Sequence, residues 1–119
     1  MKSIKELYRI GTGPSSSHTM GPRKAAEMFL TRHPEAASFK VTLYGSLAAT
    51  GKGHMTDVAI IDTLKPTAPV DIIWQPKIFL PFHPNGMNFV ALDAGGNELE
   101  NWTVYSVGGG ALAEDNKQP

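Results

Sequence analysis

The chain has 119 residues, the size of one domain, and 41 % of them are hydrophobic, which is enough for a modest core. Eleven basic and eleven acidic residues give a formal net charge of zero, so neither a nucleic acid nor a membrane is an expected partner. The sequence contains no cysteine, which excludes disulfides, cysteine-held zinc sites and thiolate-held iron–sulfur clusters within this chain.

The first ten residues predict a short helix rather than a targeting segment. Residues 3–9 carry apolar side chains at helical spacing behind a serine that suits a helix cap. The segment holds no apolar run long enough for a signal peptide or a membrane span. We therefore expect a cytoplasmic location.

A longer helix is predicted from Met20 or Pro22 to about Arg32. Pro22 suits the first helical turn, because its missing N–H group would have no intrahelical partner there. The apolar residues at helical spacing are expected to face the core: Ala25, Met28 and Phe29.

The middle of the chain predicts a strand and then a helix. Residues 39–44 alternate between apolar and polar side chains, which predicts a strand with one buried face, formed by Phe39, Val41 and Leu43. A helix is predicted over residues 56–64, with its inward face formed by Val58, Ile61 and Leu64.

The last third of the chain is rich in strand patterns. The stretches VDIIWQP and KIFLPFHP are short strand candidates, and their prolines favour edges or bulges. Residues 88–93 and 99–107 predict a hairpin across the AGGN turn, and residues 108–119 predict a loop followed by a tail. Together the elements predict a single α+β domain, with a mostly antiparallel sheet covered by two or three helices.

A run of small polar residues stands between two Gly-Pro pairs, just before the predicted long helix: Ser15, Ser16, Ser17, His18 and Thr19. The first N–H groups of a helix are unpaired and carry the positive end of its dipole, so added hydroxyls create a site for a carboxylate or phosphate. The alternative is that one hydroxyl caps the helix and the rest belong to a solvated loop. Three consecutive serines exceed what a cap needs, but both interpretations stay open.

A second candidate site lies where a glycine-rich loop leads into the predicted helix over residues 56–64. Gly51 and Gly53 flank Lys52 and precede His54, and glycine permits the close approach of a ligand. The stretch is not a phosphate-binding P-loop, because glycine stands where Ser or Thr must follow the lysine. His54 suits a general base, or it is a surface or capping histidine.

A third candidate site is the turn sequence FHPNGM. His83 and Asn85 are placed to reach a ligand, or they belong to a turn that only feeds the hairpin. The four histidines of the chain lack the close spacing of a metal site, so no metal site is predicted. We interpret His33, before Pro34, as structural.

Four motifs of this chain occur in the same order in the iron–sulfur-dependent L-serine dehydratases: GPSSSHTMGPRKA, LYGSLAATGKGHMTD, HPNGM and YSVGGG. The chain resembles the β subunit or β domain of that family over residues 1–114, with Thr12 in place of an expected proline. Residues 115–119 are then a tail, and we expect a truncation there, before a cluster-bearing α domain.

The resemblance implies an L-serine ammonia-lyase, which converts L-serine to pyruvate and ammonia without pyridoxal phosphate. The family uses a [4Fe–4S] cluster whose open iron acts as a Lewis acid on the leaving hydroxyl. The cysteines that hold the cluster belong to the α domain or subunit, the expected partner, so this chain should be inactive alone. A homodimer stays open as a further assembly.

The resemblance also implies roles for the candidate residues. The run from Ser15 to Thr19 would face the cluster and hold the substrate carboxylate, and His54 would abstract the α-proton. Lys52 would lower the pKa of His54 or orient the carboxylate, while His83 and Asn85 would close the pocket.

The fold is expected to resemble the allosteric substrate-binding domain of phosphoglycerate dehydrogenase. That similarity supports an alternative function, a non-catalytic regulatory module that binds a small anion. A purely structural assembly domain is a third hypothesis.

Overall fold

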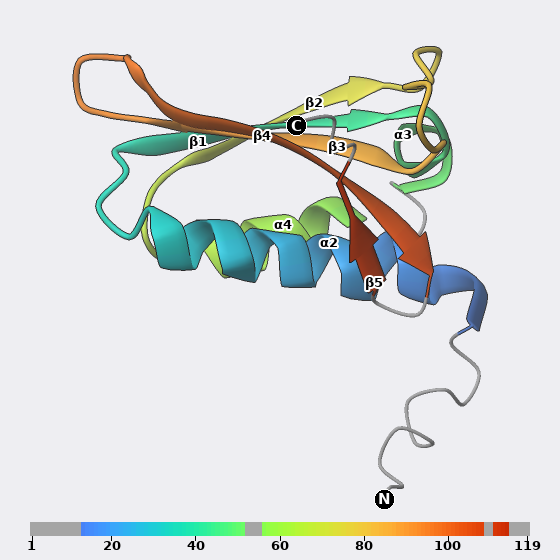
Figure 1. Ribbon diagram of the computed structural model, residues 1–119. Coiled ribbons are helices and arrows are strands. Elements are labelled where there is room, and N and C mark those ends of the chain that lie inside the picture. The colour runs from blue at the N-terminus through green and yellow to red at the C-terminus, as the bar shows by residue number, and fades with distance from the viewer. Residues whose placement is uncertain (1–12, 52–55, 109–110, 115–119) are drawn as a thin grey trace, which may run out of the picture.

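One five-stranded sheet forms the framework of the domain (Figure 1). The computed structural model describes residues 13–51, 56–108 and 111–114. In spatial order the strands are β2 (Val70–Gln75), β1 (Ser38–Tyr44), β3 (Gly86–Leu92), β4 (Glu98–Gly108) and β5 (Ala111–Ala113). The strands β1 and β2 pair in parallel, and the other neighbours are antiparallel. The predicted α+β domain with a mostly antiparallel sheet is confirmed.

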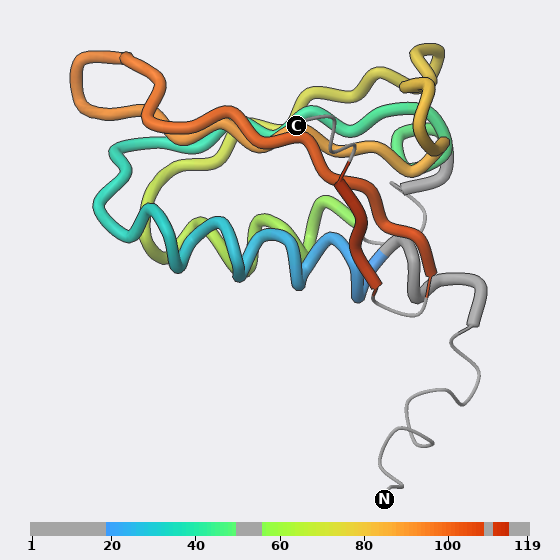
Figure 2. Tube along the Cα trace, in the orientation of Figure 1, coloured from blue at the N-terminus to red at the C-terminus, as the bar shows by residue number. Residues whose placement is uncertain are grey.

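Three helices are described. The helices α2 (Gly13–Arg32) and α4 (Thr56–Leu64) lie side by side against one face of the sheet, and α3 (Gly45–Gly51) follows β1 directly at one end of it (Figures 1 and 2). None of the described helices combines the length and the apolar character that a membrane crossing requires. The similarity to the phosphoglycerate dehydrogenase domain stays a prediction.

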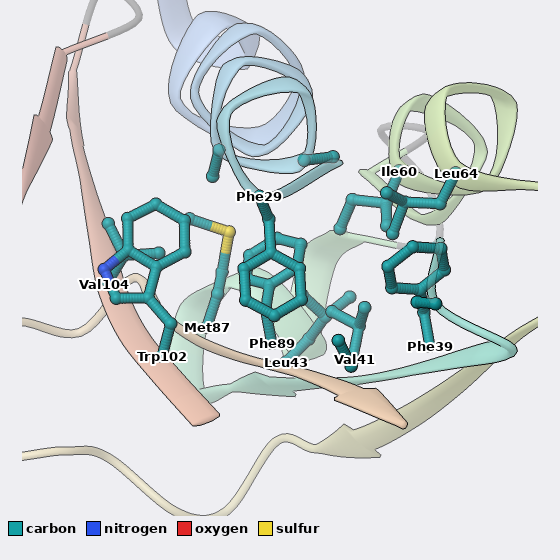
Figure 3. Close-up of a cluster of buried hydrophobic side chains, with 14 of the residues drawn as sticks. Phe29, Phe39, Val41, Leu43, Ile60, Leu64, Met87, Phe89, Trp102 and Val104 are labelled. Atoms are coloured by element: carbon teal, nitrogen blue, oxygen red, sulfur yellow. The ribbon is translucent and has the colours of Figure 1, made fainter. Parts of the chain in front are cut away.

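The core lies between the two long helices and the sheet (Figure 3). Phe29 from α2 is fully buried, and its ring centroid lies 6.2 Å from that of Phe39, 5.5 Å from Phe89 and 6.0 Å from Trp102. Burying a side chain of this size contributes roughly 1.5–3 kcal/mol to folding. The alternating residues of β1 face this core as predicted: Phe39, Val41 and Leu43.

The helix α2 begins earlier than predicted. It starts at Gly13 and not at Met20 or Pro22, so the serine run lies in its first turns and not in a preceding loop. Pro22 lies inside the helix, where it removes one backbone hydrogen bond. Most of the stability of a helix in a protein comes from tertiary packing, and α2 continues through the proline because it packs on the sheet.

The inward faces of the helices are partly different from the prediction. Met28 is 41 % exposed and Val58 is 38 % exposed, so neither belongs to the core. In α4 the predicted Leu64 is buried, but Ile61 is only half-buried, and Ala59 and Ile60 complete the buried apolar face. The sequence VAIIDTL offers apolar side chains on more than one helical face, so its periodicity could not choose the inward one.

Two strand assignments also differ from the prediction. The stretch KIFLPFHP forms turns and irregular backbone, because prolines cannot donate to a strand ladder. A short strand, β5, replaces the loop predicted after β4, and α3 was not anticipated. The hairpin, β2 and the bounds of α4 are confirmed. The helix predicted over residues 3–9 lies outside the described residues.

A charged cluster joins the end of α2 to β4. The guanidinium of Arg32 donates to both carboxylate oxygens of Glu100, at 3.1 and 3.2 Å, and lies 4.5 Å from the ring centroid of Trp102. His33 Nε2 donates to the same carboxylate at 2.5 Å. Partial burial raises the pKa of Glu100, but the hydrogen bonds from Arg32 and His33 outweigh it and hold the pKa below its ordinary value.

Glu100→Gln is expected to lower the free energy of unfolding at pH 7 by about 0.2–1 kcal/mol, the value of a partly exposed ion pair. Because the pKa is lower in the folded state, the carboxylate stabilises the fold above its unfolded pKa. That contribution is lost as the pH falls through the folded pKa. Urea unfolding at pH 7 and at successively lower pH should show the difference between the variant and the wild type shrink as the pH falls. Glu98→Gln is the control, and an equal loss at every pH would contradict the prediction.

Candidate functional site

The four sequence motifs meet at one end of the domain, on the right in Figure 1. The first half of α2, the junction of β1 with α3, the turn before β3 and the last part of β4 all contribute to this end. These segments are far apart in the chain, and contacts of small residues and backbone groups join them. We refer to this end, with the turn over residues 83–85 at its centre, as the motif end.

The turn over residues 83–85 is fixed to two neighbouring elements. The carbonyl of Pro84 accepts a hydrogen bond from the backbone N–H of Ser46 in α3, at 3.1 Å. The Asn85 carbonyl accepts one from the Ser106 N–H at 3.1 Å, and the Asn85 side-chain amide donates to the Ser106 carbonyl at 3.0 Å. Ser106 lies in β4 and is fully buried. A buried strand residue therefore holds Asn85 by both its carbonyl and its side-chain amide.

Two glycines allow the elements to approach so closely. Gly45 has a φ of 52°, and a Cβ there would lie 2.7 Å from the Pro84 carbonyl oxygen and 2.8 Å from the Phe79 ring. Gly21 lies in α2 against β4, and a Cβ there would lie 2.8 Å from the Cβ of Ser106. All three distances are too short for a Cβ atom, so glycine is required at both positions.

His83 lies beside an aromatic wall. Its Nδ1 atom accepts a hydrogen bond from the Asn85 backbone N–H at 3.1 Å, and its ring centroid lies 6.5 Å from that of the buried Tyr105. The Phe82 ring also packs against Tyr105, with centroids 4.8 Å apart. The imidazole is therefore held in one orientation at a half-buried position.

Large apolar side chains are exposed in the loop that leads to this turn. Ile78 is 45 % exposed, Phe79 57 % and Phe82 48 %. We call these three residues the apolar loop patch. Three such side chains within five residues, on a loop that packs against α3 and β4, are typical of a surface that another protein covers.

The structure places the predicted site residues as follows. The backbone of Ser15, Ser16, Ser17 and His18 lies in the first two turns of α2, and their side chains lie outside what the structure describes. Thr19 is half-buried in the same helix. The unpaired N–H groups that favour an anion therefore lie in the first turn of α2, which begins at Gly13, and not near Met20 or Pro22 where the helix was predicted to begin.

The remaining predicted residues divide into two groups. His83 and Asn85 are adjacent and hydrogen-bonded to each other, and they are joined to α2 through Ser106 and Gly21. Lys52 and His54 lie outside the described residues. Sequence reasoning missed Ser106 as the connecting residue. The available signal was a small polar residue within the motif YSVGGG, between large side chains of a strand.

The residues of this chain do not fit a thiolate-held cluster. The sequence contains no cysteine, and within residues 13–51, 56–108 and 111–114 no three His, Asp or Glu side chains gather into a metal site. The imidazole of His83 and the N–H groups at the start of α2, which have no intrahelical partner, are groups that suit hydrogen bonding to a small polar anion.

The model of the serine dehydratase beta chain family matches residues 3–72 and 62–117. The L-serine dehydratase of Streptomyces coelicolor is 35 % identical over 154 aligned residues, which cover 96 % of this chain and 34 % of the relative. That of Haemophilus influenzae is 34 % identical, covering 97 % and 34 %. L-serine dehydratase TdcG of Escherichia coli is 36 % identical, again covering 97 % and 34 %.

The chain therefore spans about a third of the length of these curated relatives. The aligned length exceeds 119 residues, so the relatives carry residues within the matched region that have no counterpart here. The two segments matched by the family model overlap at residues 62–72, which end α4 and begin β2. That stretch lies away from the motif end (Figure 1). Because the family model matches nearly the whole chain, the chain belongs to the serine dehydratase beta chain family.

Proposed function

We propose that this chain forms the β part of an L-serine ammonia-lyase, which converts L-serine to pyruvate and ammonia. Loss of water from L-serine gives an aminoacrylate, whose hydrolysis returns the water and yields the two products. The observation that carries the proposal is the gathering of all four motifs at one end of the domain, where small residues and backbone bonds join them. The curated relatives whose alignments cover 96 % and 97 % of this chain are named L-serine dehydratases.

Each proposed role matches the chemistry of the group concerned. His54 would accept the α-proton, a task suited to a neutral imidazole near pH 7. The first-turn N–H groups of α2, with the hydroxyls of the run from Ser15 to Thr19, would hold the substrate carboxylate. Lys52 would orient that carboxylate or act on His54, and His83 and Asn85 would form the rim of the pocket.

We further propose that an α part completes the site and carries the iron–sulfur cluster, since this chain has no cysteine to hold one. The matched relatives extend well beyond the region that corresponds to this chain. Phe82 of the apolar loop patch and His83 both lie against Tyr105, so a partner docked on the patch would also cover part of the motif end. The chain alone would then be inactive.

Reconstitution tests this function. By itself, neither this chain nor a cluster-bearing α part should form pyruvate from L-serine. Mixing the two parts under anaerobic conditions should restore turnover. Phe79→Ser with Phe82→Ser should weaken the rescue, because it removes apolar area from the docking surface. The matched control is Leu99→Ser, a residue 42 % exposed in the hairpin at the other end. Tight binding of a small anion by the chain alone, with no rescue by the α part, would favour the regulatory module instead.

A further inference from the structure

The contacts of His83 determine which ring nitrogen carries the proton. The backbone N–H of Asn85 points at Nδ1 from 3.1 Å, and a backbone N–H can only donate. Nδ1 must therefore present its lone pair. In the neutral ring the proton then resides on Nε2, so His83 offers a hydrogen-bond donor on that side.

The donor that sets this tautomer is itself fixed. Asn85 exchanges two hydrogen bonds with the main chain of Ser106, one through its carbonyl and one through its side-chain amide. Ser106 is fully buried in β4 and packs against Gly21 of α2. Pro84, between the two residues of the turn, is bonded to α3. The imidazole thus receives its orientation from three secondary-structure elements.

We propose that His83 binds the substrate carboxylate through its Nε2–H group and does not abstract a proton. A neutral ring in this tautomer can take up a proton only at Nδ1, and doing so would break the bond from Asn85. A fixed N–H donor on a half-buried imidazole suits an anion instead. The inference rests on the proposed function for the identity of the anion, while the position of the ring proton rests on geometry alone.

If His83 donates a hydrogen bond to the carboxylate, it has a different role from His54. His83 would act as a donor and His54 as an acceptor, so one cannot replace the other. His83 is a substrate-binding residue in this scheme, and its loss should change substrate affinity more than the rate of the chemical step.

Nitrogen-15 NMR of the 119-residue chain tests the position of the proton. His83 Nδ1 should give a pyridine-like resonance and Nε2 a pyrrole-like one. Asn85→Pro removes the donating N–H and should return His83 to a mixture of tautomers, while unchanged His33 resonances show that the fold persists. If that variant fails to fold, the wild-type spectrum still decides. A His83 ring protonated at Nδ1 in the neutral wild type would overturn the proposal.

Kinetics of the assembled enzyme test the carboxylate role. His83→Ala should raise the KM for L-serine about 10- to 100-fold, the usual loss for a hydrogen bond to a charged group, with kcat within a few-fold. His83→Gln supplies an amide N–H near the position of Nε2 and should recover most of the affinity. Both variants should keep the pH profile of kcat. A drop in kcat above about 100-fold at unchanged KM, or a lost limb of that profile, would show that His83 transfers a proton.

These outcomes distinguish the two proposals. A wild-type complex that fails to turn over L-serine contradicts the proposed function and with it the carboxylate role. The tautomer of His83 is decided by the spectrum in either case.

Discussion

Replacing His54 with alanine in the assembled enzyme is expected to lower kcat by a factor of about 10²–10⁴, which is the usual contribution of a general base. The chemical reason is that the α-proton of L-serine is only weakly acidic, so its removal needs a positioned acceptor. An imidazole can accept a proton only when neutral, so turnover of the wild type should fall in acid. Stopped assays of pyruvate formation across pH measure both effects.

The matched control for this prediction is His33→Gln. His33 lies at the end of α2, in contact with Glu100 and away from the motif end, so its replacement should leave kcat unchanged. The His54→Ala variant should also lose the acid limb of the pH profile, because no neutral base remains to be protonated. Turnover close to the wild-type value would exclude His54 as the base and favour a β part that serves only assembly.

Gly21→Ala is expected to destabilise the domain by about 1–3 kcal/mol, as overpacked sites do. Alanine favours a helix over glycine by about 1 kcal/mol, so propensity alone predicts the opposite sign. The new Cβ would overlap the Ser106 hydroxyl and lie 2.8 Å from the Ser106 Cβ, and neither atom belongs to a long flexible side chain. The helix or the strand must therefore shift, and the packing cost exceeds the helical gain. Urea unfolding of the chain measures the difference.

A second substitution separates this contact from a general loss of packing. Ser106→Gly removes the atoms that the new methyl group would meet, so the double variant should recover at least about 1 kcal/mol relative to the sum of the single ones. Gly95→Ala is the surface control, since its Cβ would approach only the Asn97 side-chain amide, at 3.2 Å. Its effect should stay within about 0.5 kcal/mol. If Gly21→Ala were as stable as the wild type, the helix would not be held against Ser106.

Local periodicity was sufficient to predict the elements that have one buried face. The strand with Phe39, Val41 and Leu43 follows a strict alternation, and the hairpin has both an alternating pattern and a turn sequence. Periodicity could not identify the inward face of α4, because apolar residues lie on more than one side of it. It also missed β5, which pairs with the end of β4 only a few residues before it, because three residues are too few to show an alternating pattern.

The start of α2 illustrates a different limit. Pro22 is favoured in a first turn, and that preference led to a start seven to nine residues too late. Gly21, next to this proline, packs against Ser106 of β4. A contact between residues so far apart in the sequence cannot be predicted from a local pattern. The same limit applies to the candidate site. The turn sequence was enough to predict His83 and Asn85 as candidates, whereas the role of Ser106 is visible only from its hydrogen bonds to Asn85.

The contact between Gly21 and Ser106 has a consequence for the order in which the chain folds. The hairpin of β3 and β4 joins neighbouring segments and can form within microseconds. The contact between Gly21 and Ser106 instead closes a loop that contains most of the domain. Closing that loop costs conformational entropy before the contact can stabilise the fold. We therefore expect the motif end to be completed late in folding. A partner that binds there would then act on the last-formed part of the domain and shift the folding equilibrium toward the native state.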